Sequence, residues 1–288
     1  MPHATSIDGS VRVDGGVLRY VCEGAGVPAL VIGSAVYYPR VFSPRLREYL
    51  RLIFADTRHF ATGGWASGSG ELSLRTYLDD VERIRASLEL DRVVLIGHSH
   101  HGSLAVEYAK RHPERVSHIV LIGSPPVDVP STMTAAEMYW QQHASRQRKA
   151  ALQDNLAAVR AEEEKGLTPE QAYVRRYVAE GPRYWYDLNY NASKLWDGVP
   201  LNMDVINVFR TFFAEGYEMR CNPDQLTAPV LVAVGRYDYA VPPTLWTARQ
   251  TALPNLSLRL FEYSGHTPQL EEPHAFDEVL LDWLGRLH

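Results

Sequence analysis

The chain has 288 residues, of which 45% are hydrophobic and 22% are charged, and its formal net charge is −5. These values are ordinary for a globular protein with one large domain, whose core needs neither disulfides nor a structural metal. The mild acidity and the absence of a basic stripe argue against nucleic acid as a partner, and no apolar run reaches the roughly 18 residues of a membrane span.

The cysteine content and the first residues bear on the compartment. Cys22 and Cys221 lie far apart and have no metal-ligand spacing, which is typical of a reducing compartment. The opening stretch MPHATSIDGS has neither the basic start nor the apolar core of a signal peptide. We therefore expect a cytoplasmic protein without a membrane partner; the sequence indicates no particular oligomeric state.

Short apolar runs alternate with helix-period segments along most of the chain. Rough alternation over residues 11–23, around a Gly-Gly turn, predicts an opening β-hairpin. Helix periodicity covers residues 73–90 and 103–111. Strand-length runs rich in β-branched residues follow the hairpin at residues 29–33, 51–56, 92–97, 118–123, 229–235 and 256–262. Strands that alternate with helices predict a parallel sheet covered on both faces.

This alternation stops between residues 127 and 226, where the sequence is helix-like and rich in charged and aromatic residues. The strand pattern resumes at Pro229. The simplest interpretation is a core domain of residues 1–126 and 227–288, with a helical lid of residues 127–226 inserted between two late strands.

The stretch LIGHSHHG, residues 95–102, lies between a predicted strand and a predicted helix. A sharp strand-to-helix turn projects Ser99 beyond the carboxyl end of the sheet, where ligands of parallel sheets bind. The turn also presents the N–H of His100 at a helix N-terminus, which favours developing negative charge. Ser99 is thus a candidate nucleophile, although a helix N-cap is a common alternative role for such a serine.

A serine hydroxyl needs a base to remove its proton and a third group to orient that base. Asp238 follows one late strand and His266 follows the next, so both are expected at the same sheet edge as Ser99. The chain order of nucleophile, acid and histidine is the order found in α/β-hydrolases. Alternatively, Asp238 forms an Asx turn and His266 is a surface turn residue.

The three histidines around Ser99 allow a metal site as another interpretation. Clustered histidines bind zinc in metallo-hydrolases. However, no aspartate follows at the required spacing, and His98 and His100 would have to share the turn that Ser99 occupies. We therefore expect no metal and no other cofactor.

The whole chain resembles the lidded branch of the α/β-hydrolase family, which includes proline iminopeptidases, small carboxylesterases and lactonases. The resemblance rests on the motifs DTRHF, GHSHHG, YAKRHPERVSHIVLIGSPP, PVLVAVGRYDYAVP and GHTPQLEEP. It implies an α/β-hydrolase fold, with a mostly parallel central sheet, helices on both faces and an inserted helical lid. It further implies that Ser99 is the nucleophile, His266 the general base and Asp238 its orienting acid, with backbone N–H groups of His100 and Ser34 as the oxyanion hole.

Three positions depart from the family pattern. His101 stands where the elbow motif Gly-x-Ser-x-Gly has its last glycine, and Gly102 follows one step late. Ile32 replaces the histidine that usually precedes the glycine of the oxyanion loop, and His59 replaces a glycine of the DTRHF stretch. We expect His101 either to fill the gap beside the sheet or to contribute to substrate binding.

The expected reaction is hydrolysis of an ester, lactone or amide of a small, largely apolar acyl substrate. A proline iminopeptidase-type aminopeptidase is an alternative, for which the acidic run at residues 162–164 could bind the substrate amine. A receptor or lyase that has lost hydrolysis is a second alternative. Substrate contacts are expected from side chains near the oxyanion loop, at the elbow and in the lid: Tyr37, Tyr38, His101, Trp140, Trp185, Tyr186 and Phe212.

Overall fold

The structure is a computed structural model, and it describes residues 6–62, 72–164, 166–214, 216–219, 226–247 and 255–286. In these residues one eight-stranded sheet has the strand order β1-β2-β4-β3-β5-β6-β7-β8. The strands are β1 (Ile7–Val13), β2 (Gly16–Glu23), β3 (Val27–Gly33), β4 (Leu50–Asp56), β5 (Val93–His98), β6 (Val116–Ile122), β7 (Val230–Gly235) and β8 (Leu256–Phe261).

The sheet is mostly parallel, as the sequence predicts. Only the β1–β2 and β2–β4 pairs are antiparallel, and every pair from β4 to β8 is parallel. The opening hairpin starts earlier than expected, because Ile7 already pairs with Cys22 and Ser10 with Arg19. Most of β1 is exposed at the edge of the sheet, so its first residues lack the apolar alternation that reveals a half-buried strand.

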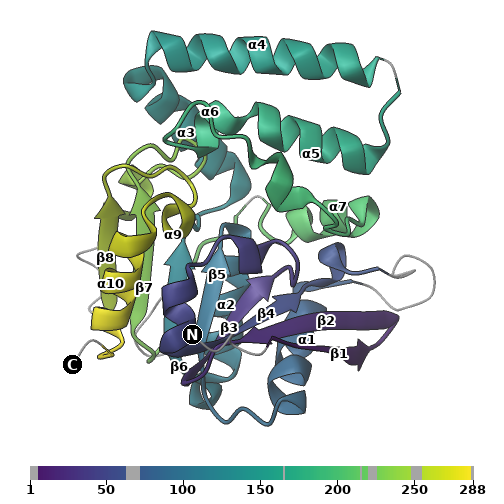
Figure 1. Cartoon of the computed structure of the whole chain (residues 1–288), viewed down its shortest axis with the longest axis vertical. Helices are drawn as coiled ribbons and strands as arrows, with labels where there is room; N and C mark the ends of the chain where they lie inside the picture. The colour runs from purple at the N-terminus through teal and green to yellow at the C-terminus, as the bar shows by residue number, and fades with distance from the viewer. Residues whose placement is uncertain are drawn as a thin grey trace.

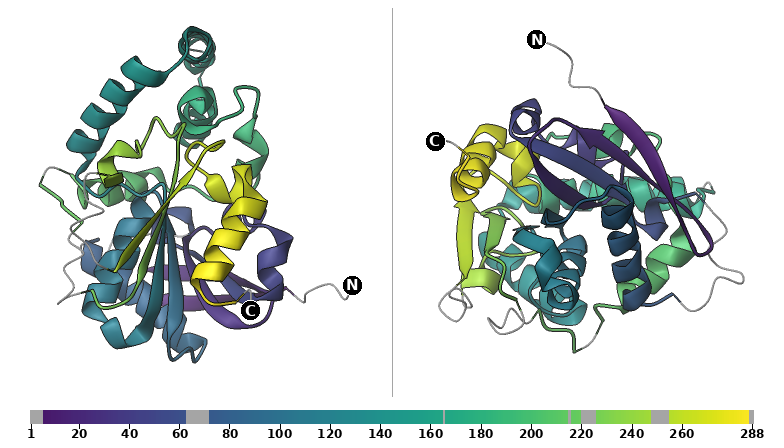
Figure 2. Two further views of the ribbon diagram at one scale, coloured as in Figure 1. Left: turned by 90° about the vertical axis from the view of Figure 1, so that its left-hand side faces the viewer. Right: turned by 90° about the horizontal axis from the view of Figure 1, so that it is seen from below.

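The sheet is buried on both faces because each inner strand sends alternate side chains to opposite sides. In β5, for example, Leu95 belongs to one apolar cluster while Val94 and Ile96 belong to the other. The first cluster includes side chains of α1 (Leu74–Ser87) and α2 (His100–Arg111). The second includes side chains of the short helix η2 (Pro44–Glu48) and α10 (Pro273–Trp283). Figure 2 shows these helices on the two sides of the twisted sheet.

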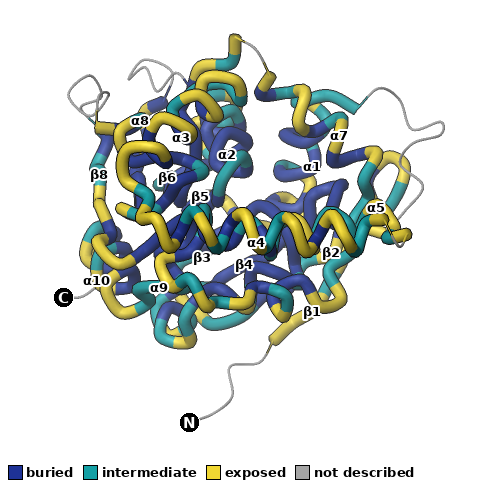
Figure 3. The backbone as a smooth tube through the Cα atoms, turned by 90° about the horizontal axis from the view of Figure 1, so that it is seen from above, coloured by how far each residue is buried: buried dark blue, intermediate teal, exposed yellow. Residues whose placement is uncertain are grey.

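Helices also fill the sequence between β6 and β7. They are α3 (Val129–His143), α4 (Arg146–Glu163), α5 (Pro169–Ala179), α6 (Gly181–Tyr184), η5 (Ala192–Trp196) and α7 (Met203–Thr211). We call them the inserted helices. Figure 1 shows α4, α5 and α6 above the sheet, and in Figure 3 the exposed residues of α4 lie over the buried strands.

Short helices occupy the remaining connections. They are η1 (Tyr38–Arg40), η3 (Arg58–Phe60), η4 (Pro113–Arg115), α8 (Thr244–Thr247) and α9 (Pro268–Glu271). In the part of the chain that the structure describes, no helix has both the length and the apolar character needed to cross a bilayer. Cys22 is buried as a free thiol, whereas Cys221 lies outside the described residues.

Candidate active site

Ser99 occupies a strained turn between β5 and α2. Its backbone angles, φ 54° and ψ −134°, are rarely adopted by residues other than glycine. The Ser99 N–H donates to the carbonyl of Ile122 at 2.8 Å, which ties the turn to the end of β6. The side chain of Ser99 does not cap α2, so the N-cap alternative has no support in the geometry.

The strand and the helix of the elbow meet at Gly97 and Gly102, and Gly102 lies one residue later than the second glycine of the family pattern. A Cβ atom on Gly97 would lie 2.4 Å from the Cα of Gly102, so strand and helix approach each other at these two positions. The second glycine of the elbow is therefore needed at position 102. His101 has room for its side chain, which is only 8% exposed.

His266 and Asp238 form a buried hydrogen-bonded pair. His266 Nδ1 lies 2.7 Å from Asp238 Oδ2, and both residues are almost completely buried. The other oxygen, Oδ1, accepts the N–H groups of Ala240 at 2.9 Å and Val241 at 2.7 Å. Asp238 thus forms the Asx turn and also holds His266, whereas His266 is not a surface residue. Because the carboxylate only accepts, Nδ1 carries the proton and Nε2 of a neutral His266 is left as a base.

The imidazole of His266 lies against the strand ends that carry the elbow. A Cβ atom on Gly123 would lie 2.9 Å from His266 Nδ1, and Gly123 directly follows the carbonyl that accepts the Ser99 N–H. His98, the residue before Ser99, has its ring centroid 4.7 Å from that of His266. Among the described residues, Ser99 Oγ has no hydrogen-bond partner.

Two backbone amides are candidates for an oxyanion hole. His100 is the first residue of α2, so its N–H has no acceptor within the helix. Ser34 directly follows β3 and is completely buried, and its Oγ accepts the N–H groups of Val36 and Tyr37, each at 3.2 Å. This turn fixes the backbone at Ser34.

Asp56 anchors the same loop from the end of β4. Its Oδ1 accepts the N–H of Ala35 at 2.7 Å, while Oδ2 is buried without a partner. Burial raises the pKa of this carboxyl group to about 6.

A series of aromatic side chains leads from His266 through the inserted helices to Tyr37. The ring of Tyr184 lies 5.6 Å from the imidazole of His266. The backbone carbonyl of Tyr184 accepts the backbone N–H of His266 at 2.6 Å. Tyr177 stacks on Tyr184 at 4.9 Å, and its hydroxyl lies 3.3 Å from that of Tyr37. Trp196 lies 5.0 Å from the rings of both Tyr37 and Tyr177. Of these four aromatic residues, only Tyr37 is among the substrate contacts expected from the sequence.

The other expected contact residues are dispersed. Trp140 packs in a separate cluster with Tyr139 and Tyr239. Tyr186 is 39% exposed and packs edge-on against Tyr237 and Tyr263 at the surface.

Trp185 and Phe212 have mainly packing contacts. Trp185 is only 1% exposed and lies 4.5 Å from the ring of Tyr190. Phe212 packs against Tyr77 and Phe209. Neither residue contacts the His266 ring in the geometry described above.

Two of the three histidines of the elbow, His98 and His101, have protein partners at both ring nitrogens, whereas His100 Nε2 is buried without one. His98 Nδ1 lies 3.3 Å from the hydroxyl of Tyr38, and its Nε2 lies 2.9 Å from the carbonyl oxygen of His266. Both ring nitrogens are therefore already used. The residues covered by the structure contain no group of three or more His, Cys, Asp or Glu placed to hold a metal ion.

The acidic run at residues 162–164 lies on the surface of α4 rather than at His266. Glu162 pairs with Arg175 at 3.3 Å and Glu163 with Arg176 at 2.6 Å, with side chains that are exposed except for that of Glu163, which is partly buried. A different carboxylate lies near the site: Glu180 Oε2 accepts the hydroxyl of Tyr184 at 2.9 Å.

Comparisons with known proteins show the family to which the chain belongs. Residues 32–273 match the family described as alpha/beta hydrolase fold. The AB hydrolase superfamily protein YclE of Bacillus subtilis is 35% identical over 278 residues, which cover 96% of this chain and 98% of that protein. A proline iminopeptidase of Heyndrickxia coagulans is 26% identical and covers 74% of each chain.

The fold also has counterparts among solved structures. An alpha/beta fold family hydrolase from Bacillus anthracis superposes with a TM-score of 0.72 at 20% identity, covering 96% of this chain and 99% of that one. The motifs, the sheet and the sequence match lead to one conclusion: the chain belongs to the α/β-hydrolase family.

Proposed function

We propose that this protein is a serine hydrolase that cleaves an ester, lactone or amide bond of a small, largely apolar acyl substrate. The observation that carries the proposal is the buried Asp238–His266 pair, set against the strand ends that hold Ser99 in a strained turn. Backbone strain and a histidine oriented by a buried carboxylate are features that active sites retain despite their cost.

The proposed reaction has two halves. His266 Nε2 takes the Ser99 hydroxyl proton as Oγ attacks the substrate carbonyl, and the amides of His100 and Ser34 bind the resulting oxyanion. The intermediate collapses to an acyl-enzyme when the leaving group departs with the proton from His266. Water, deprotonated by the same imidazole, then attacks the acyl carbonyl and releases the acid and free Ser99. No step needs a cofactor.

The proposed substrate pocket lies under the inserted helices, which would act as the lid of residues 127–226. Tyr184 lies beside His266, Tyr177 stacks on Tyr184 and Trp196 packs on Tyr177, so these residues would provide aromatic surface with phenol hydroxyls as the polar groups. Burial raises the pKa of Tyr177 and Tyr184, which keeps both phenols neutral. Such a pocket favours a small neutral molecule with apolar surface.

An aminopeptidase that removes N-terminal proline is the second candidate, supported by Glu180. Its carboxylate is bonded to Tyr184, whose ring faces His266, so it could pair with a substrate amine. Comparing proline naphthylamide with p-nitrophenyl acetate decides between the two candidates. Faster cleavage of the proline substrate, lost in Glu180→Gln, would favour the aminopeptidase.

The test of the proposed function is the Ser99→Ala variant, with p-nitrophenyl acetate and then longer acyl esters and lactones as substrates. Loss of the nucleophile is expected to lower kcat by about 10⁴- to 10⁶-fold. Circular dichroism and the melting temperature report whether the variant stays folded. Full turnover by a folded Ser99→Ala protein would rule the proposal out, and failure of the wild type on every substrate would favour a receptor or lyase.

A further inference from the structure

Three histidines and two tyrosines form a continuous hydrogen-bonded chain beneath the elbow, which the mechanism above does not use. All five side chains are buried, with exposed fractions between 1% for Tyr77 and 8% for His101. They come from four separate segments: Tyr38 from η1, His59 from η3, Tyr77 from α1, and His98 and His101 from the two sides of Ser99.

The links run from α1 to the loop of His266. Tyr77 Oη lies 3.1 Å from His59 Nδ1, and His59 Nε2 lies 3.1 Å from His101 Nε2. Tyr38 Oη lies 3.3 Å from both His101 Nδ1 and His98 Nδ1. His98 Nε2 lies 2.9 Å from the carbonyl oxygen of His266, which ends the chain.

The last link fixes the direction of every other one. A carbonyl oxygen only accepts, so His98 Nε2 carries a proton and, in a neutral ring, His98 Nδ1 accepts the Tyr38 hydroxyl proton. Tyr38 Oη must then accept from His101, so His101 is protonated on Nδ1 and accepts on Nε2. His59 consequently donates from Nε2 and accepts the Tyr77 hydroxyl proton on Nδ1.

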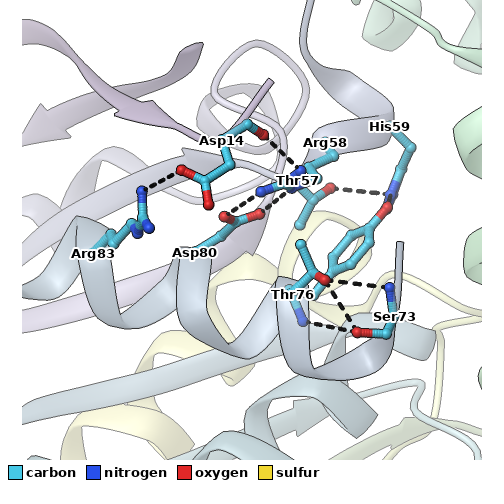
Figure 4. Close-up of polar contacts among 9 residues, drawn as sticks. Asp14, Thr57, Arg58, His59, Ser73, Thr76, Asp80 and Arg83 are labelled. Atoms are coloured by element: carbon cyan, nitrogen blue, oxygen red, sulfur yellow. Dashed lines mark hydrogen bonds and ion pairs between the residues drawn. The ribbon is translucent and has the colours of Figure 1, made fainter. Parts of the chain in front are cut away.

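These proton positions require neutral imidazoles, and burial keeps the three rings neutral. Desolvation lowers the pKa of His101 to about 3 and holds the pKa values of His59 and His98 well below the ordinary range. Thr57 is compatible with this protonation of His59 but does not select it. Its hydroxyl donates to the carbonyl of Gly33 at 3.1 Å, and the oxygen lies 3.1 Å from His59 Nε2 and 3.3 Å from His59 Nδ1. Figure 4 shows the contact between Thr57 and His59.

The hydrogen-bonded chain of side chains contacts each segment that carries a proposed reacting group. The Tyr38 N–H donates to the carbonyl of Ser34 at 3.2 Å, and its ring packs on Gly33, where a Cβ atom would lie 2.1 Å from Cε2 of Tyr38. His98 and His101 bracket Ser99 and His100 in sequence. The Tyr38 hydroxyl therefore joins the Ser34 amide segment to the elbow, and His98 joins the elbow to His266.

Two of the departures from the family pattern contact each other in this hydrogen-bonded chain. His59 and His101 both stand where a glycine is expected, and their Nε2 atoms contact each other directly with nearly parallel rings, 13° apart. His101 without His59 would have a buried Nε2 without a partner, which costs about 1–3 kcal/mol, whereas His59 without His101 would keep the Thr57 hydroxyl. The histidine at position 101 therefore depends on the one at position 59.

We propose that Tyr38 is a positioning residue for the proposed hydrolysis: through His101 and His98 its hydroxyl fixes the Ser34 loop relative to the elbow and aligns His266. This proposal rests on the proposed function. A displacement of the amides or the imidazole by about 1 Å is enough to cost about 100-fold in rate.

The first test is Tyr38→Phe, which removes the hydroxyl and keeps the ring on Gly33. We expect kcat on p-nitrophenyl acetate to fall about 10- to 100-fold, with KM within about threefold because binding surface is retained. Inactivation by a fluorophosphonate should slow by the same factor as kcat. The matched control is Tyr108→Phe in α2, which removes another buried phenol bond, 2.5 Å to Glu82, and should leave kcat unchanged.

A second pair of variants tests the link to His266. His98→Phe should reproduce the loss of kcat, and His98→Gln, whose amide can donate to the same carbonyl, should restore part of it. Wild-type kcat in a folded Tyr38→Phe or His98→Phe protein would overturn the proposal.

The third test does not depend on activity or on a variant that folds. Nitrogen-15 NMR of the wild-type imidazoles at pH 7 should show three neutral rings in the chain, with the proton on Nδ1 for His101 and on Nε2 for His59 and His98. A charged His101, or one protonated on Nε2, would overturn the proposed direction. If Ser99→Ala retains activity while these tautomers are observed, the proposed function fails and the hydrogen-bond chain stands.

Discussion

Gly123 lies so close to His266 that a Cβ atom at position 123 would be 2.9 Å from Nδ1, the nitrogen that faces Asp238. Gly123 also has φ +51°, a conformation that residues with side chains rarely adopt. The glycine after β6 therefore leaves room for the orienting hydrogen bond of the proposed base.

This contact predicts that Gly123→Ala disrupts the site more than the fold. The added methyl group should push the imidazole away from Asp238, lowering kcat by about 100-fold or more. The measurement is kcat on an activated ester, together with the melting temperature. Gly285→Ala is the matched control, because Gly285 also has positive φ, +67°, but no atom within 4 Å of an added Cβ. Equal effects of the two variants on kcat would mean that backbone strain alone explains the loss.

Asp238→Asn should leave the loop folded and remove most of the activity. The Asn side-chain oxygen can still accept the N–H groups of Ala240 and Val241, but its amide would donate to His266 Nδ1. The proton would then move to Nε2, so the imidazole could no longer act as a base toward Ser99. The expected loss of kcat is about 10⁴-fold, measured at saturating ester, while Asp91→Asn at the surface should have no effect. A loss below tenfold would contradict the orienting role of Asp238.

The pH dependence of stability should depend on His100, a partly buried residue whose Nε2 is inaccessible. Desolvation, with smaller contributions from His266 and Arg210, lowers its pKa to about 4, and its Nε2 is buried without a partner. Between the ordinary value and about 4 the unfolded chain binds the proton and the folded chain does not, so the free energy of unfolding falls as the pH falls. The stability that the neutral His100 ring contributes is fully present above roughly pH 6.5. Below that pH the free energy of unfolding falls by about 1.4 kcal/mol per pH unit.

His100→Leu should remove this dependence. The free energy of unfolding of the variant, relative to the wild type, is expected to rise by about 2 kcal/mol between pH 7.5 and pH 5. Urea titrations at both pH values measure it. Parallel pH profiles of the two proteins would show that His100 titrates normally.

The ion pair between Arg58 and Asp80 should matter for folding rather than for chemistry. Arg58 Nε lies 2.5 Å from Asp80 Oδ2, the two side chains are 2% and 7% exposed, and Arg58 also donates to the carbonyl of Asp14 (Figure 4). Arg58→Met leaves a buried carboxylate without its cation, at a cost of about 3–5 kcal/mol. The double variant with Asp80→Leu should recover most of this loss. Removing the exposed Arg115–Asp91 pair should cost at most about 1 kcal/mol.

The sequence predicts the sheet well because buried parallel strands are continuous apolar runs that end at glycines or turns. The runs at residues 29–33, 51–56 and 92–97 each overlap an observed strand. Residues 7–10 of β1 are missed because an edge strand exposed on both sides has no apolar pattern.

The site is only partly readable from sequence. Ser99, Asp238 and His266 each follow a recognisable strand, so their common edge follows from the fold. The contact between His59 and His101 cannot be predicted from the sequence, because the two residues lie 42 positions apart. At each position the sequence shows only a histidine where the family pattern has a glycine. The aromatic residues near His266 cannot be predicted from the sequence either. A helical segment with many tyrosines and tryptophans does not reveal which side chains face Ser99.

The most direct measurement of the central claim is the mass of the intact protein after treatment with a fluorophosphonate, followed by peptide mapping. We predict one adduct per chain, located on Ser99, formed at the same rate as esterase activity disappears, and absent in Ser99→Ala. An adduct on another residue, or loss of activity without modification of Ser99, would contradict the account.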